Sequence, residues 1–435
     1  MSDTSTGACT SQKFIGAPGT VVVLGSGCSL GLGVPTLAGF LDHAFALLLR
    51  MVEKESKGSK GSSECPFQHM FSKMQCFIER IKGFGGYMHL DLLNMEELYG
   101  LAAMWEGILD EKDRYQKKEA KEAKEILTVF KRVLFLVYHK AGIEFLDIEN
   151  RFDGFNLDRI RGIKRESRTE LLDPDAQVSL HTNLMAYLGL ASYRDDEGYC
   201  PAVIQFNWDL AFDRALWLLN CSECKEGAGI SPWTDFESFK NRDITFKEYP
   251  LVIRPHGGLN WVELPVNKGE RKKITDELKF KLSKTIRWDG RLICDKGYIN
   301  TSIEDNLSFR RGERMLFVPP SWKKDVSSLA WQWRLCQRYL ERARRIVFIG
   351  YSLPPSDMNI RYFLALALAN NNLVPKVYVW NPGVGNPKSE VRANYLQLFQ
   401  PLARSWRLLG IPYKFGHPGL FDLERALKSA EPILP

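Results

Sequence analysis

The chain has 435 residues, of which 45% are hydrophobic and 26% charged, a balance typical of globular proteins with a large buried core. Its net charge of +7 is too small to assign a polyanionic partner. No run of about 18 uncharged apolar residues occurs, and residues 1–12 are polar, so the sequence predicts neither a membrane span nor a secretory signal. Nine irregularly spaced cysteines favour reduced thiols, and we expect a cytoplasmic protein.

The first predicted element is a strand at 20–24, where a β-branched apolar run stops at a glycine, as in a buried parallel strand. Helical apolar spacing follows over 37–52, and the polar Gly/Ser-rich stretch 54–64 predicts a loop. Because 66–192 contains no strand-like segment, we expect residues 41–197 to form a helical insertion. Its helical patterns span 95–109, 120–141 and 177–193, and the charged run 118–125 indicates a solvated helix face.

Strand-like segments return in the second half of the chain, each followed by a polar residue or a glycine. They are 202–206 before Asn207, 250–253 shortly before His256, 346–349 before Gly350 and 376–380 before Asn381. Since ligands of open parallel sheets bind at the carboxyl ends of the strands, these residues should gather at one edge. The sequence therefore predicts an α/β fold. Its parts are a Rossmann-like parallel sheet core (14–40, 198–265 and 315–435), the helical insertion 41–197 and a charged insertion 266–314.

A glycine-rich loop, Gly25-Ser26-Gly27-Cys28-Ser29-Leu30-Gly31-Leu32-Gly33-Val34-Pro35, follows the first strand. Such a loop lets backbone N–H groups approach phosphates, although an ordinary strand-to-helix turn has a similar composition. It departs from the dehydrogenase pattern G-x-G-x-x-G, because Leu30 occupies the third glycine position and 45–51 contains no acidic residue for a ribose. Pro35 would interrupt a helix beginning at Gly27, so we expect an irregular loop as far as Pro35.

This loop resembles the G-A-G-x-S-x-x-x-G-I-P loop of the sirtuin family, which implies that it binds NAD. The matching positions are Gly25, Gly27, Ser29, Gly33 and Pro35, with Ser26 in place of the usual alanine. The resemblance covers the α/β core and leaves the helical insertion outside it.

Two further segments resemble the family's catalytic residues. Gln205-Phe206-Asn207-Trp208-Asp209 is similar to the sirtuin T-Q-N-I-D segment at Asn207 and Asp209, and differs at its first two positions. The resemblance implies that Asn207 positions a water or the ribose and that Asp209 holds the nicotinamide amide; alternatively, Asn207 caps the following helix. His256 has the H-G context of the catalytic histidine, with a structural loop histidine as the alternative.

The C-terminal part adds candidates for the adenosine half of NAD. Gly350-Tyr351-Ser352-Leu353 resembles the G-T-S segment that contacts adenosine, which implies roles for Gly350 and Ser352. Asn381 resembles the asparagine that meets the adenine ribose. Asp357 is expected either to contact a ribose or to cap a helix.

The cysteine pattern departs from the sirtuin deacylases, which carry two C-x-x-C pairs after the histidine. Here the C-x-x-C pair Cys221 and Cys224 precedes His256, and only Cys294 and Cys336 follow it. Because tetrahedral zinc needs four ligands, the sequence predicts no structural metal.

Without the zinc module, the pattern is more similar to the sirtuin-like proteins of bacterial anti-phage systems, which hydrolyse NAD to nicotinamide and ADP-ribose. The resemblance implies an NAD hydrolase in which Asn207 orients a water and His256 accepts its proton. Several such proteins are activated by assembly or by a partner, in one subgroup a HerA-type ring ATPase. Because the chain ends soon after the predicted core, we expect a homo-oligomer or a separate activating partner.

Other functions stay open from the sequence. A nucleotide sensor would hold NAD or ADP-ribose without turnover, and the missing zinc cysteines argue against a protein deacylase. The basic stretch 268–284 raises direct nucleic-acid binding as a further hypothesis. Asp276 and Glu277 interrupt its positive field, so we interpret it mainly as solvated surface.

Overall fold

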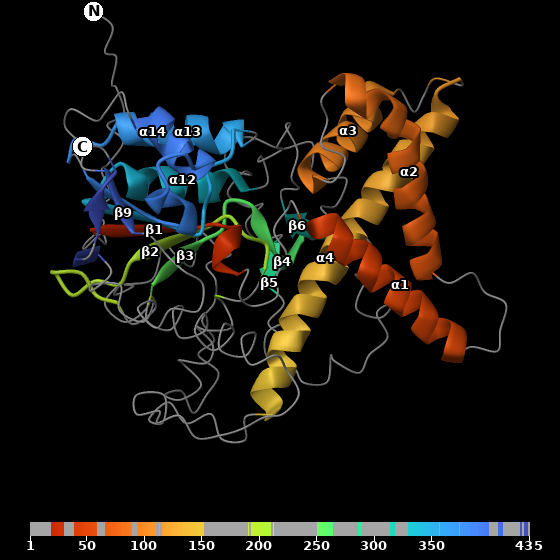
Figure 1. Ribbon diagram of the computed structural model, residues 1–435, viewed down its shortest axis with the longest axis horizontal. Coiled ribbons are helices and arrows are strands. Elements are labelled where there is room, and N and C mark those ends of the chain that lie inside the picture. Colours follow the sequence, from red (N-terminus) through yellow and green to blue (C-terminus); the bar gives the residue numbers. More distant parts are fainter. Residues whose placement is uncertain are drawn as a thin grey trace, which may run out of the picture.

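A parallel β-sheet with helices on one face and a separate helical region beside it make up the fold (Figure 1). The computed structural model describes residues 19–29, 39–58, 66–88, 94–109, 113, 115–151, 190, 193–209, 212, 250–263, 286–288, 314–317, 329–355, 357–373, 375–399, 408–411, 427–428 and 430–433. Within this part of the chain, no helix is long and apolar enough to cross a membrane.

The main sheet has the strand order β3-β2-β1-β7-β8-β9-β10. Its strands are β1 (Thr20–Leu24), β2 (Ala202–Gln205), β3 (Leu251–Ile253), β7 (Arg345–Ile349), β8 (Lys376–Trp380), β9 (Leu408–Ile411) and β10 (Glu431–Pro432). The first six are parallel, and β10 pairs antiparallel with β9 at the edge. Numbered consecutively, the parallel strands follow the order 3-2-1-4-5-6 of doubly wound Rossmann-like sheets. The predicted α/β fold with a parallel sheet is confirmed.

The central strand β1 is buried on both faces, which explains its unbroken apolar sequence. Val21 and Val23 point to one face and join the cluster beneath α12 (Ala330–Leu340), α13 (Met358–Ala369) and α14 (Glu390–Phe399). Val22 and Leu24 point to the other face and join the cluster of the helical region. The alternation of side chains along one strand therefore divides the molecule into two hydrophobic layers.

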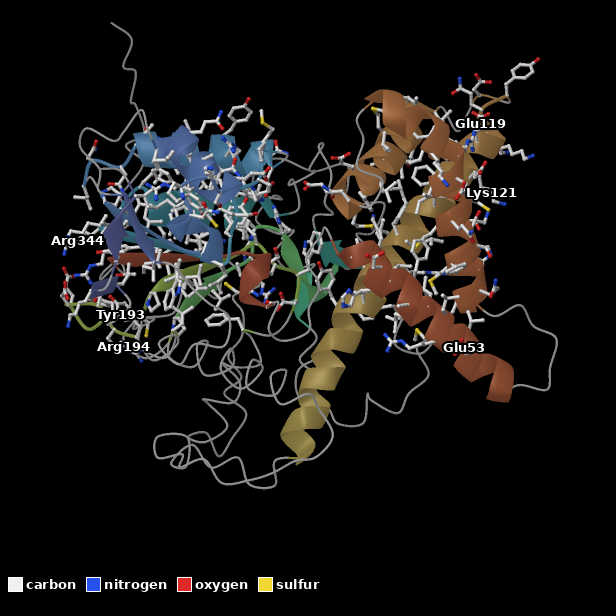
Figure 2. The ribbon with its side chains drawn as sticks, in the orientation of Figure 1. Glu53, Glu119, Lys121, Tyr193, Arg194 and Arg344 are labelled. Carbon is white, nitrogen blue, oxygen red and sulfur yellow. The ribbon has the colours of Figure 1, made fainter. Side chains whose placement is uncertain are left out.

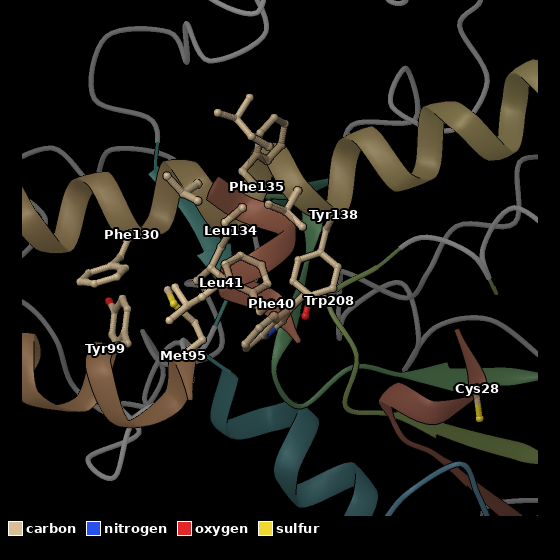
Figure 3. Packing of buried hydrophobic residues seen from close by; sticks show 14 of the residues in the cluster. Cys28, Phe40, Leu41, Met95, Tyr99, Phe130, Leu134, Phe135, Tyr138 and Trp208 are labelled. Carbon is tan, nitrogen blue, oxygen red and sulfur yellow. The ribbon is translucent and has the colours of Figure 1, made fainter. Parts of the chain in front are cut away.

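The helical region consists of α1 (Phe40–Gly58), α2 (Pro66–Met88), α3 (Met95–Ile108) and α4 (Lys117–Arg151). Its core is aromatic: the Phe130 ring centroid lies 5.8 Å from that of Phe77 and 6.4 Å from that of Tyr99, both in edge-to-face geometry. Figure 3 shows the Phe130 and Tyr99 rings next to each other. On α4, the charged run exposes Glu119 and Lys121 at the outer end of the region (Figure 2), whereas Ala120 between them is buried.

Several sequence-based boundaries need correction or lie outside the described residues. The stretch 54–58, predicted as loop, continues helix α1, because its lysines and glutamate are good helix formers. Most of the predicted helix 177–193 is not among the described residues, and Tyr193 itself is not helical. A second sheet was not predicted: β4 (Gly257–Glu263) lies between β5 (Ile286–Trp288) and β6 (Arg314–Phe317). Two glycines and a bulge in β4 hide its strand pattern.

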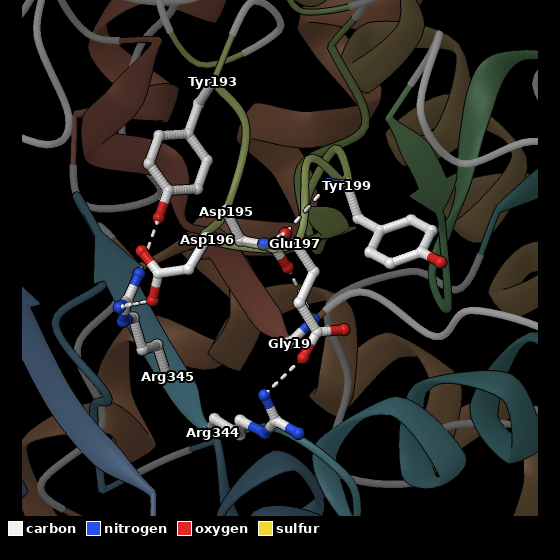
Figure 4. A network of polar contacts seen from close by, with 8 residues as sticks. All are labelled: Gly19, Tyr193, Asp195, Asp196, Glu197, Tyr199, Arg344 and Arg345. Carbon is white, nitrogen blue, oxygen red and sulfur yellow. Dashed lines mark hydrogen bonds and ion pairs between the residues drawn. The ribbon is translucent and has the colours of Figure 1, made fainter.

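A polar turn, residues 193–199, forms hydrogen bonds with the amino ends of β1 and β7 (Figure 4). This edge of the sheet is opposite to the carboxyl ends of the strands. The Asp195 carboxylate accepts hydrogen bonds from the backbone N–H groups of Gly19 and Tyr199 at 3.0 and 2.9 Å. Arg345 donates to the Tyr193 hydroxyl and to Asp196. Figure 2 shows Tyr193 and Arg344 together on this side of the molecule, away from the helical region.

We predict that Phe130→Ala lowers the free energy of unfolding by about 3 to 5 kcal/mol, because it leaves a cavity in a fully buried aromatic cluster. Tyr115→Ala, at a side chain that is 91% exposed, should change it by less than about 0.5 kcal/mol. Urea denaturation of both variants measures the difference, and equal losses would contradict the packing described for α2, α3 and α4.

A second prediction concerns the contact of α4 with α2. Glu125 accepts hydrogen bonds from Lys73 at 2.9 Å and from His69 at 3.0 Å, and the Lys73 bond lowers the pKa of the Glu125 carboxyl below its ordinary 4.5. Because the pKa of Glu125 is lower in the folded than in the unfolded chain, the ionised carboxylate stabilises the fold above pH 4.5. This contribution is lost as the pH falls below that value. Since solvent partly screens the pair, Glu125→Gln should lower the free energy of unfolding by about 0.5 kcal/mol at pH 7 and by less at pH 4. A double-mutant cycle with Lys73→Met isolates the pair, and a pH-independent cost would contradict it.

Candidate functional site

The candidate site lies at the carboxyl edge of the sheet, where β1 and β7 are neighbours. The strand order reverses at this pair, and open α/β sheets bind ligands at such a point. Gly25 follows β1 and donates its N–H to the carbonyl of Ile349, at 3.0 Å. Gly27 donates to the carbonyl of Gly350, at 2.8 Å. The two turns therefore extend the pairing of the strands beyond the sheet.

Glycine is required at three positions of this crossing because backbones meet there. A Cβ on Gly25 would lie 2.5 Å from the Cα of Tyr351, and one on Gly27 would lie 2.6 Å from the carbonyl oxygen of Gly350. Gly350 has φ +61°, and its Cβ would lie 2.4 Å from the nitrogen of Cys28. The fold explains these glycines without reference to any ligand.

In the described part of the loop, residues 25–29, the backbone donors are largely used within the protein. The N–H groups of Gly25, Gly27, Cys28 and Ser29 all donate to backbone carbonyls, which leaves that of Ser26 in the segment 25–29. Ser26 begins a single 3-10 turn, η1 (Ser26–Cys28). The predicted NAD contacts Gly33 and Pro35 lie outside the described residues. The main helix, α1, begins at Phe40, as expected for a helix that starts beyond Pro35.

Ser29, Asn207 and Asp209 form one hydrogen-bonded group on this edge. The Ser29 hydroxyl donates to the Asp209 carboxylate at 2.9 Å. The Asn207 amide nitrogen donates to the Gly25 carbonyl at 2.9 Å and to the Ser29 Oγ at 3.4 Å. Residues nearly 180 positions apart in sequence are thus brought together, with Asp209 buried and Asn207 half-buried.

Cys28, also in this loop, is a buried thiol whose Sγ donates to the Ile349 carbonyl. Burial raises the pKa of the Cys28 thiol far above its ordinary value, and the Asp209 carboxylate adds to the effect. Because only a thiolate is nucleophilic, Cys28 serves packing rather than catalysis.

Sequence reasoning missed Arg254, which is fully buried directly after β3. Its guanidinium donates to the carbonyls of Asn207 and Asp209, both at 3.2 Å. The Arg254 backbone N–H donates to the Gln332 side chain of α12 at 2.8 Å. Arginine is almost never fully buried without partners, so a charged residue at the end of an apolar strand is the signal that could have revealed it.

His256 lies on the neighbouring strand connection and is 5% exposed. Its ring centroid is 5.1 Å from that of Phe206, the residue before Asn207, and 5.6 Å from that of Trp333 on α12. His256 is therefore held among aromatic rings beside the Asn207 segment and is shielded from bulk water.

The residues predicted for the adenosine half form a second group after β7 and β8. The Tyr351 hydroxyl donates to the Asp357 carboxylate at 2.7 Å, and the Asn381 amide donates to the Tyr351 carbonyl at 3.4 Å. Asp357 occupies the N-cap position of α13 without a side-chain capping bond, whereas the Asn381 Oδ1 accepts the N–H of Gly383. Burial, and then the Asp357 carboxylate, raises the pKa of Tyr351, so this phenol stays protonated. Ser352 is exposed.

Among the described residues, no three His, Cys, Asp or Glu side chains are grouped closely enough to hold a metal ion. Of the cysteines weighed for zinc, Cys336 is buried in the α12 layer, and Cys221, Cys224 and Cys294 lie outside the described residues. The absence of a structural metal stays a prediction.

Comparison with protein-family models and with curated proteins found no match to this chain. The assignment of a function therefore depends on the residues themselves and on how the fold places them.

We predict that Gly350→Ala destabilises the protein by on the order of 3 kcal/mol, since it combines a left-handed backbone with a clash against Cys28. Two other glycines separate the causes. Gly198→Ala, at φ +80° in open space, should cost about 1 kcal/mol, and Gly107→Ala, exposed in α3, should stabilise by about 0.5 kcal/mol. Thermal unfolding ranks the three variants, and a cost at Gly350 no larger than at Gly198 would argue against the close crossing.

Proposed function

We propose that this protein is an NAD hydrolase that releases nicotinamide and ADP-ribose. The observation that carries the proposal is the convergence of Ser29, Asn207 and Asp209 at the point where the strand order reverses, with His256 on the next strand connection. Asn207, Asp209 and His256 are the residues that resemble the sirtuin catalytic segments. The shared position at one sheet edge supports reading them as one site.

The chemistry follows from the substrate. The nicotinamide ring of NAD is a cationic leaving group, so cleavage of its bond to ribose develops oxocarbenium character at the anomeric carbon. The buried carboxylate of Asp209 suits a cationic ring, and its oxygens can accept the carboxamide N–H. Since the Ser29 hydroxyl already donates to Asp209, the carboxylate is held in place before the substrate arrives.

Asn207 would orient the attacking water, and His256 would deprotonate it. Both hydrogens of the Asn207 amide nitrogen have protein acceptors, so its Oδ1 is the atom suited to accept a hydrogen from a water or a ribose hydroxyl. His256 would take the proton of that water as general base. The segment from Gly350 to Asp357, together with Asn381, would face the adenosine half. Ser26 would donate its backbone N–H to the pyrophosphate.

The resemblance extends the proposal to a role as an effector of bacterial anti-phage defence. In that setting the active form is a homo-oligomer or a complex with an activator such as a HerA-type ring ATPase. Assays should therefore include concentrated protein and a co-expressed partner as well as the dilute chain.

We predict that Asn207→Ala and His256→Ala each lower the rate of nicotinamide release from NAD by about 100-fold or more, because each removes a group that handles the attacking water. Chromatography of nicotinamide and ADP-ribose measures the rate, and thermal unfolding confirms that the variants fold. Matched controls are His69→Ala on α2 and Asn370→Ala at the end of α13, which should leave the rate unchanged.

The outcomes separate the rival functions. Undiminished hydrolysis in both site variants would overturn the assignment of the site. Calorimetric NAD binding with no product under any activating condition would indicate a nucleotide sensor. Release of acetate from an acetyl-lysine peptide would indicate a deacylase.

A further inference from the structure

Arg254 binds the two backbone carbonyls that flank Trp208. Its Nη1 donates to the carbonyl of Asn207 and its Nη2 to that of Asp209, both at 3.2 Å, and the side chain has no exposed surface. A guanidinium presents its N–H donors in a fixed plane, so one group can hold two carbonyls two residues apart. This bridge fixes the backbone from which the Asn207 and Asp209 side chains project.

The same residue begins the turn that carries His256. The Arg254 carbonyl accepts the N–H of Gly257 at 2.9 Å, with Pro255 and His256 at the two central positions. Among the described non-glycine residues, only Leu353 has a positive φ, so His256 has the negative φ of a type I turn. Proline favours the position that it occupies in such a turn.

A third contact, made by its backbone, ties Arg254 to helix α12. Its backbone N–H donates at 2.8 Å to the buried side chain of Gln332 on α12, the helix whose Trp333 ring contacts His256. The Asn207 segment, the His256 turn and helix α12 therefore meet at one arginine. A shift of Arg254 would move Asn207 relative to His256.

We infer that Arg254 is a positioning residue that sets the separation between the Asn207 amide and the His256 ring; its catalytic importance rests on the proposed NAD hydrolysis. Arginine is needed because a lysine ammonium is a compact point charge that cannot hold both carbonyls in one plane. Small displacements of catalytic groups lower the rate of the chemical step far more than they weaken binding of the whole substrate.

The test compares Arg254→Lys with the matched control Arg345→Lys, whose arginine bridges Tyr193 and Asp196 at the other edge of the sheet. Arg254→Lys should lower kcat for NAD about 10- to 100-fold with KM within about 3-fold, whereas Arg345→Lys leaves both unchanged. Arg254→Met, which cannot donate, should lower kcat further, so that lysine gives partial rescue. Rates are taken well below the Tm of each variant, so that a loss of folded protein does not imitate the effect.

Amide hydrogen exchange supplies a readout that does not depend on turnover. Arg254→Lys should speed exchange in 202–209 and leave 193–199 unchanged, and Arg345→Lys should do the reverse. Unchanged kcat in Arg254→Lys, or an equal loss of kcat in both variants, would overturn the inference. If the wild-type protein hydrolyses no NAD as the dilute chain, at high concentration or with a co-expressed partner, the proposed function fails. Unchanged exchange in 202–209 would then show separately that Arg254 does not hold the segment.

Discussion

The contact on which the rest of this structure depends is the backbone crossing between the turns that follow β1 and β7. Gly25 and Gly27 pair with the carbonyls of Ile349 and Gly350, and a Cβ at any of the three glycines would meet another backbone at 2.4 to 2.6 Å. The crossing extends the central strand pair past the edge of the sheet. It thereby brings the turn of Ser29 and the segment of Tyr351 to the same place, where the strand order reverses.

Around this crossing, several buried polar groups form hydrogen bonds with one another, which offsets their loss of water. Asp209 is bound by Ser29, the carbonyls of Asn207 and Asp209 by Arg254, and Asp357 by Tyr351. The site groups are consequently oriented before any ligand binds. Such preorganisation is what a catalyst needs, because no free energy is then spent on ordering its dipoles during the reaction.

The helical region supports the same edge from the other layer of the molecule. Tyr138 of α4 packs edge-to-face on Trp208, with ring centroids 5.8 Å apart, and also contacts Phe40 at the start of α1 (Figure 3). Trp208 lies between Asn207 and Asp209 in sequence. Helix α4 therefore packs against the same segment whose carbonyls Arg254 binds. The helices that the sequence separates from the sheet core share one hydrophobic cluster with Val22 and Leu24 of β1.

The sequence by itself determined the parallel sheet and the positions where its strands end, because buried parallel strands are continuous apolar runs that stop at a polar residue or a glycine. It also marked Asn207, Asp209, His256 and Asn381, which follow those strands. Only the tertiary structure decided which groups each of these side chains contacts. The glycines are required by backbone contacts between residues 323 and 324 positions apart in sequence. Four of the five N–H groups in the described loop segment 25–29 bind carbonyls, and Arg254 bridges to the Asp209 carbonyl, 45 residues away. Such contacts depend on which loops meet at the switch point, and no local pattern encodes that meeting, because hydrogen bonds and backbone contacts across a sheet edge leave no periodicity along the chain.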